Sequence, residues 1–335
     1  MESTKNITME DIARQLNISV STVSRSFTRG DLVNPETRQK VREICRKLNY
    51  RPNLNARAIA TRKTNVIGLI ARNISLIHEF ESFAYNLENI LHQNGYTLQI
   101  ELGHSEPERE NRIVETMLDR LVDGIILCSR NYVGSIPAVE ILAKATTPFV
   151  MLGYYHDQNI SQVVEDYQAG GKAITEHLLS LGHKKIALVT YQQGDPRIRG
   201  YELAHKEHNQ AVNPELIYLV SPKMDNLGDV IDDIMAKKVA AMFPMHDEMA
   251  AIVYRICHQR KISIPNDLAV ASTGHMRNTD LWAPPLTVYR MVQDNFGESI
   301  GSILLDKIAN NNSPTRIIHF GGQLITRGST VKSYQ

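Results

Sequence analysis

Cysteine is scarce in this sequence, and a long apolar run is absent from it. Its three cysteines, Cys45, Cys128 and Cys257, lie more than 80 residues apart, so they fit neither a disulfide framework nor the spacing of metal ligands. No run of about 18 uncharged apolar residues occurs, and the first residues carry charge where a signal peptide is apolar. We therefore expect a protein that is neither exported nor membrane-spanning and that works in the reducing cytoplasm.

We also expect no enzymatic function, because the motifs of common enzymes do not support one. No His-x-x-x-His or Cys-x-x-Cys spacing supports a metal site, and we expect no serine nucleophile of the Gly-x-Ser-x-Gly type. The run Ala169-Gly170-Gly171-Lys172 is similar to a phosphate loop, but Asp166 stands where its first glycine is required and Ala173 where it needs Ser or Thr. Catalysis and cofactor binding are therefore not indicated.

Length and charge predict a multidomain protein with a basic end. The chain has 335 residues, of which 42% are hydrophobic and 22% charged, so it can form a sizeable core and has the length of two or three domains. Residues 1–64 hold 13 of the 37 Lys and Arg but only 6 of the 36 Asp and Glu. This polarity is expected when one end meets a polyanion. Solvated helix faces remain the alternative explanation of the charge.

The basic segment begins with a pattern of two short helices. Thr8 is a suitable N-cap, acids follow it, and apolar residues at helical spacing predict a helix over Met9–Leu16. Asn17 tolerates the left-handed conformation, and Ser19 can cap a second helix over Val20–Thr28. Two helices joined by three or four residues form a helix-turn-helix, whose second helix enters the major groove of DNA.

A third helix completes this small unit. Asn34 serves as its cap and Pro35 as its first residue. In the second helix, the spacing leaves Ser21, Ser24 and Arg25 on the outside. The positions that the helical spacing turns inward are Ile12, Ala13, Leu16, Val23, Phe27, Val41, Ile44, Cys45 and Leu48.

Two stretches, ITMEDIARQLNISVSTVSRSF and VNPETRQKVREICRKLNYRPNLNARAIA, resemble the DNA-binding head and hinge of the lactose-repressor (LacI/GalR) family. The shared pattern is D-I-A-x-x-x-x-x-S-x-x-T-V-S-R, followed by V-x-x-x-T-R-x-K-V and L-N-Y-x-P-N. The resemblance implies a helix-turn-helix DNA-binding domain over 1–50 and a hinge helix with linker over 51–64. The DNA-binding residues that it implies are Thr8, Ser19, Val20, Ser21, Thr22, Ser24, Arg25, Arg29, Asn53, Ala56, Arg57 and Ile59.

Residues 53–60, NLNARAIA, resemble the hinge helix of that family, which folds when a dimer straddles its operator. Eight residues are too few to be helical alone in water, so ordering is expected to be coupled to DNA binding. The resemblance implies that one apolar residue from each subunit enters the minor groove, and Ile59 stands at that position in place of the usual leucine. An ordinary linker is the alternative explanation of this segment.

From Thr64 onward, short β-rich runs alternate with amphipathic stretches of helix length, which predicts parallel sheets covered by helices on both faces. Some 270 residues exceed one comfortable core, so two lobes are expected. The predicted strands are Val66–Ile70, Thr97–Leu102, Gly124–Leu127, Phe149–Leu152, Ile186–Thr190, Ala240–Phe243 and Leu268–Ser272. The predicted helices are Phe80–Asn94, Glu108–Arg120, Gly171–Leu181, Arg199–Asn209 and Glu248–Arg260.

This body also resembles the sensor of the same family, which is built like periplasmic sugar-binding proteins, with two lobes, three crossovers and a ligand in the cleft. The resemblance rests on T-N-V-I-G-L-I, D-G-I-I-L, L-G-H-K-K-I-A-L-V, R-I-R-G-Y, D-E-M-A and P-P-L-T. It implies an effector-binding and dimerisation domain over 65–335, with one lobe at about 65–165 and 291–322 and another at about 166–290 and 323–335. The expected fold is an all-α helix-turn-helix head plus an α/β two-lobed periplasmic-binding-protein-like sensor with parallel sheets.

The expected ligand pocket departs from the family pattern. Arg197 precedes Gly200-Tyr201 at the family's spacing, and its planar fork suits vicinal hydroxyls or a carboxylate. The family's Gly-Tyr-Asp-Asp is Ser272-Thr273-Gly274-His275 here, and an Asp after the fourth strand is Gly153, so the identity of the ligand is not inherited. An anionic ligand and a neutral sugar both remain open. The expected effector-binding residues are Asn73, His78, Phe80, Ser129, Glu165, Arg197, His246, Asp247 and His275.

Together, these features predict a homodimeric transcription regulator, most simply a repressor. It is expected to bind pseudo-palindromic operator DNA and a small effector, a sugar or a sugar-derived metabolite. No cofactor, metal or enzymatic activity is expected. A periplasmic-type solute receptor without regulatory DNA binding is the alternative, and the basic helix-turn-helix segment argues against it.

Overall fold

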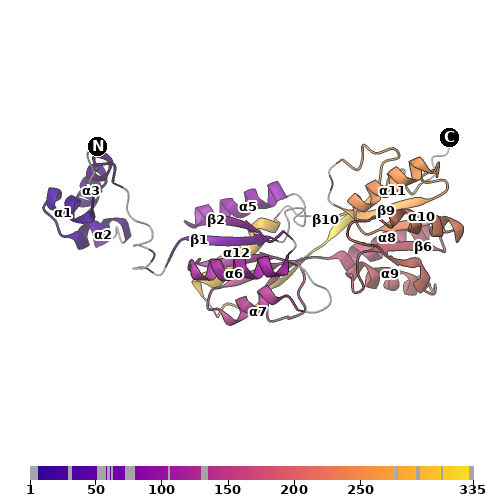
Figure 1. Cartoon of the computed structure of the whole chain (residues 1–335), viewed down its shortest axis with the longest axis horizontal. Helices are drawn as coiled ribbons and strands as arrows, with labels where there is room; N and C mark the ends of the chain where they lie inside the picture. The colour runs from indigo at the N-terminus through magenta and orange to yellow at the C-terminus, as the bar shows by residue number, and fades with distance from the viewer. Residues whose placement is uncertain are drawn as a thin grey trace. The chain divides into compact units, whose positions relative to one another are not determined.

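The structure of the chain, a computed structural model, divides into two units, Met1–Asn65 and Val66–Gln335, and each is described by itself (Figure 1). Most of the predicted hinge segment lies outside the described residues. The described residues are 7–28, 32–50, 58, 61, 63–71, 80–104, 106–129, 135–274, 276, 278–291, 295–310 and 312–331.

The described part of the first unit has three principal helices, drawn in indigo in Figure 1: α1 (Met9–Leu16), α2 (Val20–Thr28) and α3 (Pro35–Lys47). The predicted bounds of the first two are confirmed residue for residue. The apolar faces of all three meet in one core, whose buried side chains are Ile12, Ala13, Val23, Val41 and Cys45. Leu16, Phe27, Ile44 and Leu48 pack against this core while partly exposed. The helical spacing therefore predicted the core of the head correctly.

Capping side chains fix the turn between α1 and α2. Thr8 and Asp11 form a capping box, in which the backbone N–H of Asp11 donates to Thr8 Oγ1 at 3.3 Å and the backbone N–H of Thr8 donates to the Asp11 carboxylate at 3.1 Å. Asn17 ends α1 with a left-handed φ of 50°. At the start of α2, Ser19 Oγ accepts from the backbone N–H of Thr22 at 3.1 Å. Asn17 thus adopts the left-handed conformation that was predicted for it.

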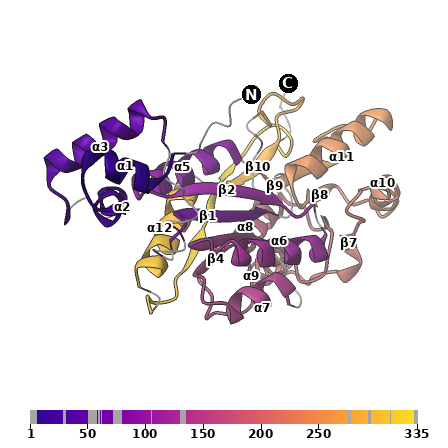
Figure 2. The same cartoon turned by 60° about the vertical axis from the view of Figure 1, so that its left-hand side comes forward.

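The second unit begins with a sheet whose strands lie in the order β11-β5-β4-β3-β1-β2, and whose described pairs are all parallel. Ile67 and Leu69 of β1 pack on one side of this sheet against α5 and α12, while Ile70 packs on the other side with α6 and α7. Figure 2 shows α5 and α6 on opposite sides of β1 and β2. The strands are β1 (Val66–Ala71), β2 (Thr97–Leu102), β3 (Gly124–Cys128), β4 (Phe149–Leu152), β5 (Gln162–Glu165) and β11 (Ile317–Phe320), and the helices are α5 (Phe80–Gln93), α6 (Pro107–Asp119), α7 (Pro137–Lys144) and α12 (Phe296–Ala309).

A second sheet follows, in the order β12-β10-β9-β8-β6-β7. Ala187 and Val189 of β6 pack on the side of α10 and α11, while Ile186 and Leu188 pack on the side of α8 and α9. The strands are β6 (Ile186–Thr190), β7 (Ile217–Leu219), β8 (Ala241–Pro244), β9 (Ala269–Gly274), β10 (Thr287–Met291) and β12 (Gly322–Ile325). The helices are α8 (Tyr167–Ser180), α9 (Pro196–Glu207), α10 (Leu227–Ala236) and α11 (Asp247–Gln259), with a short 3-10 helix η3 (Pro214–Leu216) before β7.

The expected two-lobed α/β architecture with mainly parallel sheets is confirmed. One edge of the second sheet differs from the expectation, because β10 and β12 pair antiparallel. The antiparallel edge arises where the chain leaves β11 in the first sheet and enters β12 in the second after a single residue, Gly321.

The chain passes between the two sheets at three places: from β5 to α8, from β10 to α12, and from β11 to β12. The first passage consists of Glu165, Asp166 and Tyr167, and Asp166 caps α8 by accepting from the backbone N–H of Ala169 at 2.9 Å. Two elements of different lobes are thus joined without a loop, which holds the side chains of this passage in fixed positions relative to the ends of β5 and α8.

Two glycines allow α8 and α9 to pack unusually closely. A Cβ on Gly171 of α8 would lie 2.5 Å from the carbonyl oxygen of Arg197, and a Cβ on Gly200 of α9 would clash with the carbonyl oxygen of Gln168. The run that is similar to a phosphate loop therefore lies inside α8, where its glycines serve contact between helices.

Replacing Gly200 by alanine should destabilise the second unit by about 1–3 kcal/mol, because the added methyl group meets backbone atoms that cannot move aside. The measurement is the urea midpoint of the full chain. Gly228→Ala is the matched control: the nearest atom to its added Cβ is Nη2 of Arg260 at 3.0 Å, the end of a flexible side chain that needs to shift by only a few tenths of an ångström, and alanine is the better helix former in α10. Equal midpoints for the two variants would contradict the close packing of α8 on α9.

Candidate DNA-binding and effector-binding sites

The exposed face of α2 carries the residues that sequence analysis predicted to contact DNA. Val20 is 39% exposed, and Ser21 and Arg25 are exposed too, whereas Val23 and Ser26 are buried. Half-buried Thr22 and Ser24, the exposed Ser19, and the exposed cap Thr8 of α1 are the other predicted contacts that the structure describes. Arg29, Asn53, Ala56, Arg57 and Ile59 lie outside the described residues.

Three of these residues form a hydroxyl cluster at the first turn of α2. Ser19 Oγ lies 2.8 Å from both Ser21 Oγ and Thr22 Oγ1. The N-terminus of a helix attracts anions because its first N–H groups are unsatisfied and the helix dipole is positive there. Serine and threonine hydroxyls can donate to phosphate oxygens and to base edges. The start of α2 thus combines the groups that a major-groove contact requires.

In the second unit, a pocket of about 220 Å³ lies at the passage from β5 to α8. Glu165, one of the predicted effector-binding residues, lies in its wall, and Tyr167 Oη donates a short hydrogen bond to the Glu165 carboxylate. The described lining residues are Tyr154, Val164, Glu165, Asp166, Tyr167, Gln168, Pro196 and His319. Side chains from both lobes therefore meet in this pocket.

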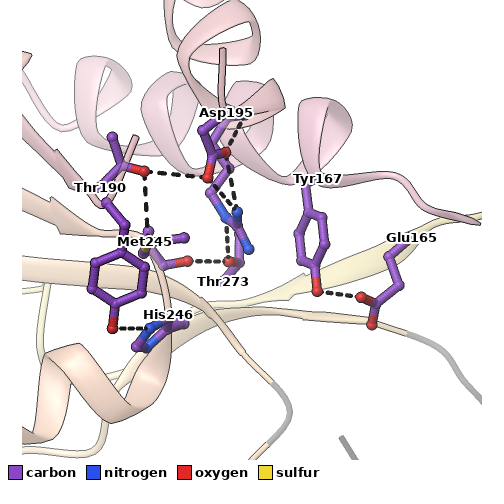
Figure 3. Close-up of polar contacts among 9 residues, drawn as sticks. Glu165, Tyr167, Thr190, Asp195, Met245, His246 and Thr273 are labelled. Carbon is purple, nitrogen blue, oxygen red and sulfur yellow. Dashed lines mark hydrogen bonds and ion pairs between the residues drawn. The ribbon is translucent and has the colours of Figure 1, made fainter. Parts of the chain in front are cut away.

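Arg197, the predicted ligand-binding arginine, lies directly behind this wall and is only 3% exposed. Its Nη1 donates to both carboxylate oxygens of Asp195, at 3.1 and 3.0 Å, and its Nε donates to Thr273 Oγ1 at 2.9 Å. The guanidinium carbon lies 3.8 Å from the centre of the Tyr167 ring. Figure 3 shows Asp195 and Thr273 with their hydrogen bonds, and Tyr167 beside them with its hydroxyl toward Glu165. The arginine is thus held by a buried carboxylate of its own helix.

The hydrogen bonds continue from Arg197 into the strand ends of the second sheet. Thr273 Oγ1 donates to the backbone carbonyl of Met245 at 2.5 Å, and Thr190 Oγ1 donates to Asp195 at 3.2 Å. Both threonines are buried and lie at the carboxyl ends of β6 and β9, so they fix the position of the Arg197–Asp195 pair.

His246, another predicted effector contact, forms the N-cap of α11. Its Nδ1 accepts from the backbone N–H of Met249 at 3.0 Å, so the neutral ring carries its proton on Nε2 and donates to Tyr191 Oη at 2.7 Å. Burial raises the pKa of Tyr191 to about 12, with Glu248 adding to the shift and Arg197 opposing it. Tyr191 therefore keeps its proton at neutral pH, and its hydroxyl accepts from His246 beside the Arg197 cluster.

Asp247 fills the space beside Gly274, the position at which the family pattern has an aspartate. Its carboxylate is fully buried and accepts from the backbone N–H groups of Glu248 at 3.0 Å and Met276 at 2.7 Å. A Cβ on Gly274 would clash with this carboxylate. Gly274 is thus required by the position of Asp247, which anchors the chain after β9.

The other predicted effector contacts are not among the described residues that line the pocket. Ser129 is buried at the end of β3, 3.5 Å from the Glu110 carboxylate, and Phe80 begins α5 and packs partly buried on the first sheet. Asn73, His78 and His275 lie outside the described residues.

Sequence reasoning missed several residues of this site, among them Asp195, Tyr167 and Tyr191. For Asp195 a signal was present, because Asp195-Pro196 is a cap followed by a proline at the first helical position, and it places α9 three residues earlier than predicted. No pattern marked Tyr167 and Tyr191, since their roles depend on the packing of α8 and on the end of β6.

One Gly-x-Ser-x-Gly pattern does occur, at Gly297–Gly301, so the expectation that none is present is wrong. The nucleophile of such a motif stands on a sharp turn between a strand and a helix. Here Ser299 is the fourth residue of α12, and both glycines pack against α5, where a Cβ would clash. The motif therefore serves helix packing. Among the described residues, no cluster with the composition of a metal site and no helix able to cross a membrane is present.

The stability of the second unit should fall as the pH drops below about 6.5, the ordinary pKa of histidine. Burial lowers the pKa of His177 in α8, as does the nearby His183, and burial lowers the pKa of His205 in α9 although its hydrogen bond to the Tyr201 carbonyl opposes the shift. The native state favours the neutral rings. Their contribution to the free energy of unfolding is therefore present above the unfolded-state pKa and is lost as the pH falls through the folded-state pKa.

Urea midpoints measured between about pH 7.5 and pH 5.5 test this expectation. His177→Gln keeps a nitrogen near Thr330 Oγ1, and His205→Asn keeps a donor for the Tyr201 carbonyl. Each should flatten the pH dependence, whereas His258→Asn on the exposed side of α11 should leave it unchanged. If the urea midpoint depended on pH equally in the parent and in both variants, these histidines would not be the cause of the dependence.

Comparisons with known proteins cover both units. Residues 8–53 match the family described as bacterial regulatory proteins, lacI family, and residues 175–330 match the periplasmic binding protein-like domain. Catabolite control protein A of Priestia megaterium is 30% identical over 316 residues, which are 92% of this chain and 94% of that protein. The ribose operon repressor of Escherichia coli K12 is 27% identical over 333 residues, covering 96% and 99% of the two chains.

Solved structures show the same fold along nearly the whole chain. A lac repressor dimer bound to operator and the anti-inducer ONPF has a TM-score of 0.79 at 20% identity and covers 98% of this chain and 100% of its own. The complex of the transcriptional regulator CelR with cellobiose has a TM-score of 0.71 at 23% identity, with coverage of 96% and 99%. Neither match leaves a large part of the chain without a counterpart.

Proposed function

This chain belongs to the LacI family of bacterial regulatory proteins, and from that premise we propose that it represses transcription by binding a pseudo-palindromic operator as a homodimer. It is a DNA-binding transcription regulator, and the similar regulators are matched over 93–99% of their length. The observation that carries the proposal is the exposed face of α2, where Val20 and Ser21 follow the capped N-terminus and Arg25 lies about one turn further along. The fold of α1 and α2 leaves this face free of the head's own core.

The proposed division of labour follows the expected domains: 1–50 for DNA binding, 51–64 for the hinge, and 65–335 for effector binding and dimerisation, with lobes at about 65–165 with 291–322 and 166–290 with 323–335. In the head, the proposed base-reading residues are Val20 and Ser21, while Thr22, Ser24 and Arg25 contact neighbouring groups of the operator. Ile59 is the proposed minor-groove residue of the hinge.

The proposed effector is a small sugar or sugar-derived metabolite that binds in the pocket between β5 and α8. Its location at an interlobe passage supports this, as do the names of the ribose operon repressor and of the CelR–cellobiose complex among the similar proteins. A ligand in such a pocket changes operator affinity only by its differential affinity for two lobe arrangements. The proposal includes no catalytic role, in keeping with the regulators to which the chain is similar.

Selection from a random pool of duplex DNA with the full chain tests this function. We expect the enriched sequences to share an inverted repeat, because two identical heads read two half-sites. The logarithm of affinity should fall with the logarithm of salt concentration, by about 0.9 per phosphate contact. Arg25→Ala should make that slope less steep by about two for a dimer while leaving the enriched sequence unchanged. Enrichment of no common sequence would exclude the proposed operator binding, and enrichment of single half-sites alone would exclude the dimer.

A further inference from the structure

The charge of the effector pocket is set by a pairing that sequence analysis did not anticipate. Arg197 and Asp195 are 3% and 1% exposed, and Nη1 of the arginine contacts both oxygens of the carboxylate. A bidentate pair of this kind cancels the positive charge that the arginine would otherwise offer to a ligand. The arginine behind the wall is therefore already matched with an internal anion.

The wall in front of this pair is acidic. Among the described lining residues, Glu165 and Asp166 carry carboxylates and no lysine or arginine is present; His319 is exposed. The Glu165 carboxylate accepts the Tyr167 hydroxyl, and Asp166 accepts a backbone N–H of α8, so neighbouring groups fix both acids in place. An anionic ligand would meet two negative side chains here, whereas a cation would meet favourable charge.

The neutral groups of the pocket suit a hydroxylated ligand of small size. Tyr154 offers an aromatic face and a phenol group and Gln168 an amide, which can accept hydrogen bonds from hydroxyls and donate to them. Pockets for drug-sized ligands hold roughly 300–1,000 Å³. The volume of about 220 Å³ is smaller and suits a single sugar ring.

We propose that the effector is a monosaccharide-sized polyhydroxyl compound with a protonated amine, of the amino-sugar class, whose ammonium group pairs with Glu165 and Asp166. This inference rests on the proposed function, since it names the ligand class of the same pocket. Arg197 supports the wall by holding Asp195 and the Tyr167 ring and does not receive an anionic group of the ligand.

Titration calorimetry on the full chain tests the proposal with three matched series: glucosamine, galactosamine and mannosamine; the parent hexoses; and their 6-phosphates and uronic acids. At about pH 6.5 the amines are protonated. We expect one amine to bind about tenfold or more tightly than its parent hexose, and its phosphate and acid counterparts to bind more weakly than the parent. An ammonium–carboxylate pair in a pocket supplies a difference of this size.

Three variants assign that preference to its residues. Glu165→Gln should reduce the affinity for the amine about tenfold and change that for the parent hexose less than about twofold. Asp195→Asn keeps a capping residue and a hydrogen-bond acceptor while freeing the charge of Arg197, so it should weaken amine binding and strengthen binding of the acid. Glu176→Gln is the control, because that carboxylate lies on α8 outside the pocket and pairs with Lys172.

Preferential binding of a phosphate, an acid or a neutral hexose would overturn the proposal, and so would binding of no member of the three series. Operator binding measured on the same preparations separates these results from failure of the proposed function. If the chain binds a selected inverted repeat but no amine, the ligand class is wrong and the regulator remains; if it binds neither, the proposed function itself is wrong.

Discussion

Arg197→Ala should lower the free energy of unfolding of the second unit by about 3–5 kcal/mol. The substitution leaves the Asp195 carboxylate buried without its counter-charge, and it also removes the donor to Thr273 and the cation stacked on Tyr167. Removal of one partner of a buried ion pair is costly because the remaining charge stays out of water. Urea unfolding of the full chain, followed by near-UV circular dichroism, measures this loss.

Two comparisons identify the cause of that loss. Arg199→Ala, on the same helix but 64% exposed, should change the free energy of unfolding by no more than about 0.5 kcal/mol. The double variant Arg197→Met/Asp195→Asn removes both charges and keeps the shape, so it should recover a large part of the stability. A loss in Arg197→Ala no greater than in Arg199→Ala would show that the pair contributes little. The effect of the ion pair on ligand affinity is measured by comparing the double variant with the parent. Arg197→Ala is unsuitable for this comparison, because its loss of stability would itself weaken binding.

The head could be predicted from sequence almost completely, because local signals determine it. Thr8, Ser19 and Asn34 cap helices whose apolar residues recur at helical spacing, and the bounds of α1 and α2 follow from these residues alone. In the second unit, Thr97–Leu102 and Ile186–Thr190 were predicted residue for residue, since each is bounded by turn residues and contains a compact β-rich run.

Elements whose residues depend on distant partners were not predicted. Strands β5, β7, β10, β11 and β12 are only three to five residues long and gain their stability from neighbours in the sheet. The start of α8 was missed because Gly170 and Gly171 disfavour a helix locally, and only the close approach of α9 explains them. Helices α7, α10 and α12 were missed as well.

The same limit applies to the effector site. Arg197 stands in a recognisable pattern, but its pairing with Asp195 and its stacking on Tyr167 require the folded helix and the neighbouring lobe passage. The contact between Gly274 and the buried Asp247 carboxylate, which leaves no room for a Cβ, is likewise visible only in three dimensions. Sequence patterns thus located the site, while packing determines its charge.

Removal of residues 1–65 should abolish specific operator binding, with a loss of at least about a thousandfold, and leave the second unit folded. The hydrophobic core of the head contains only residues between Ile7 and Tyr50, and the four described core clusters of the second unit contain only residues from Val66 onward. No buried apolar cluster is therefore cut by the deletion. The truncated chain should keep one cooperative urea transition close to that of the parent and the same affinity for the effector.

Footprinting of a selected operator with the full chain and with residues 66–335 measures the loss, and calorimetry on the same samples measures effector binding. The full-length variant Val20→Ala is a useful control, because it trims an exposed side chain of α2 and should weaken discrimination between operators while sparing the fold of the head. Protection of the operator by residues 66–335 alone would place DNA recognition outside α2. The separate hydrophobic cores predict that the second unit folds and binds the effector without the head. Loss of effector binding in residues 66–335 would instead show that the head contributes to the sensor.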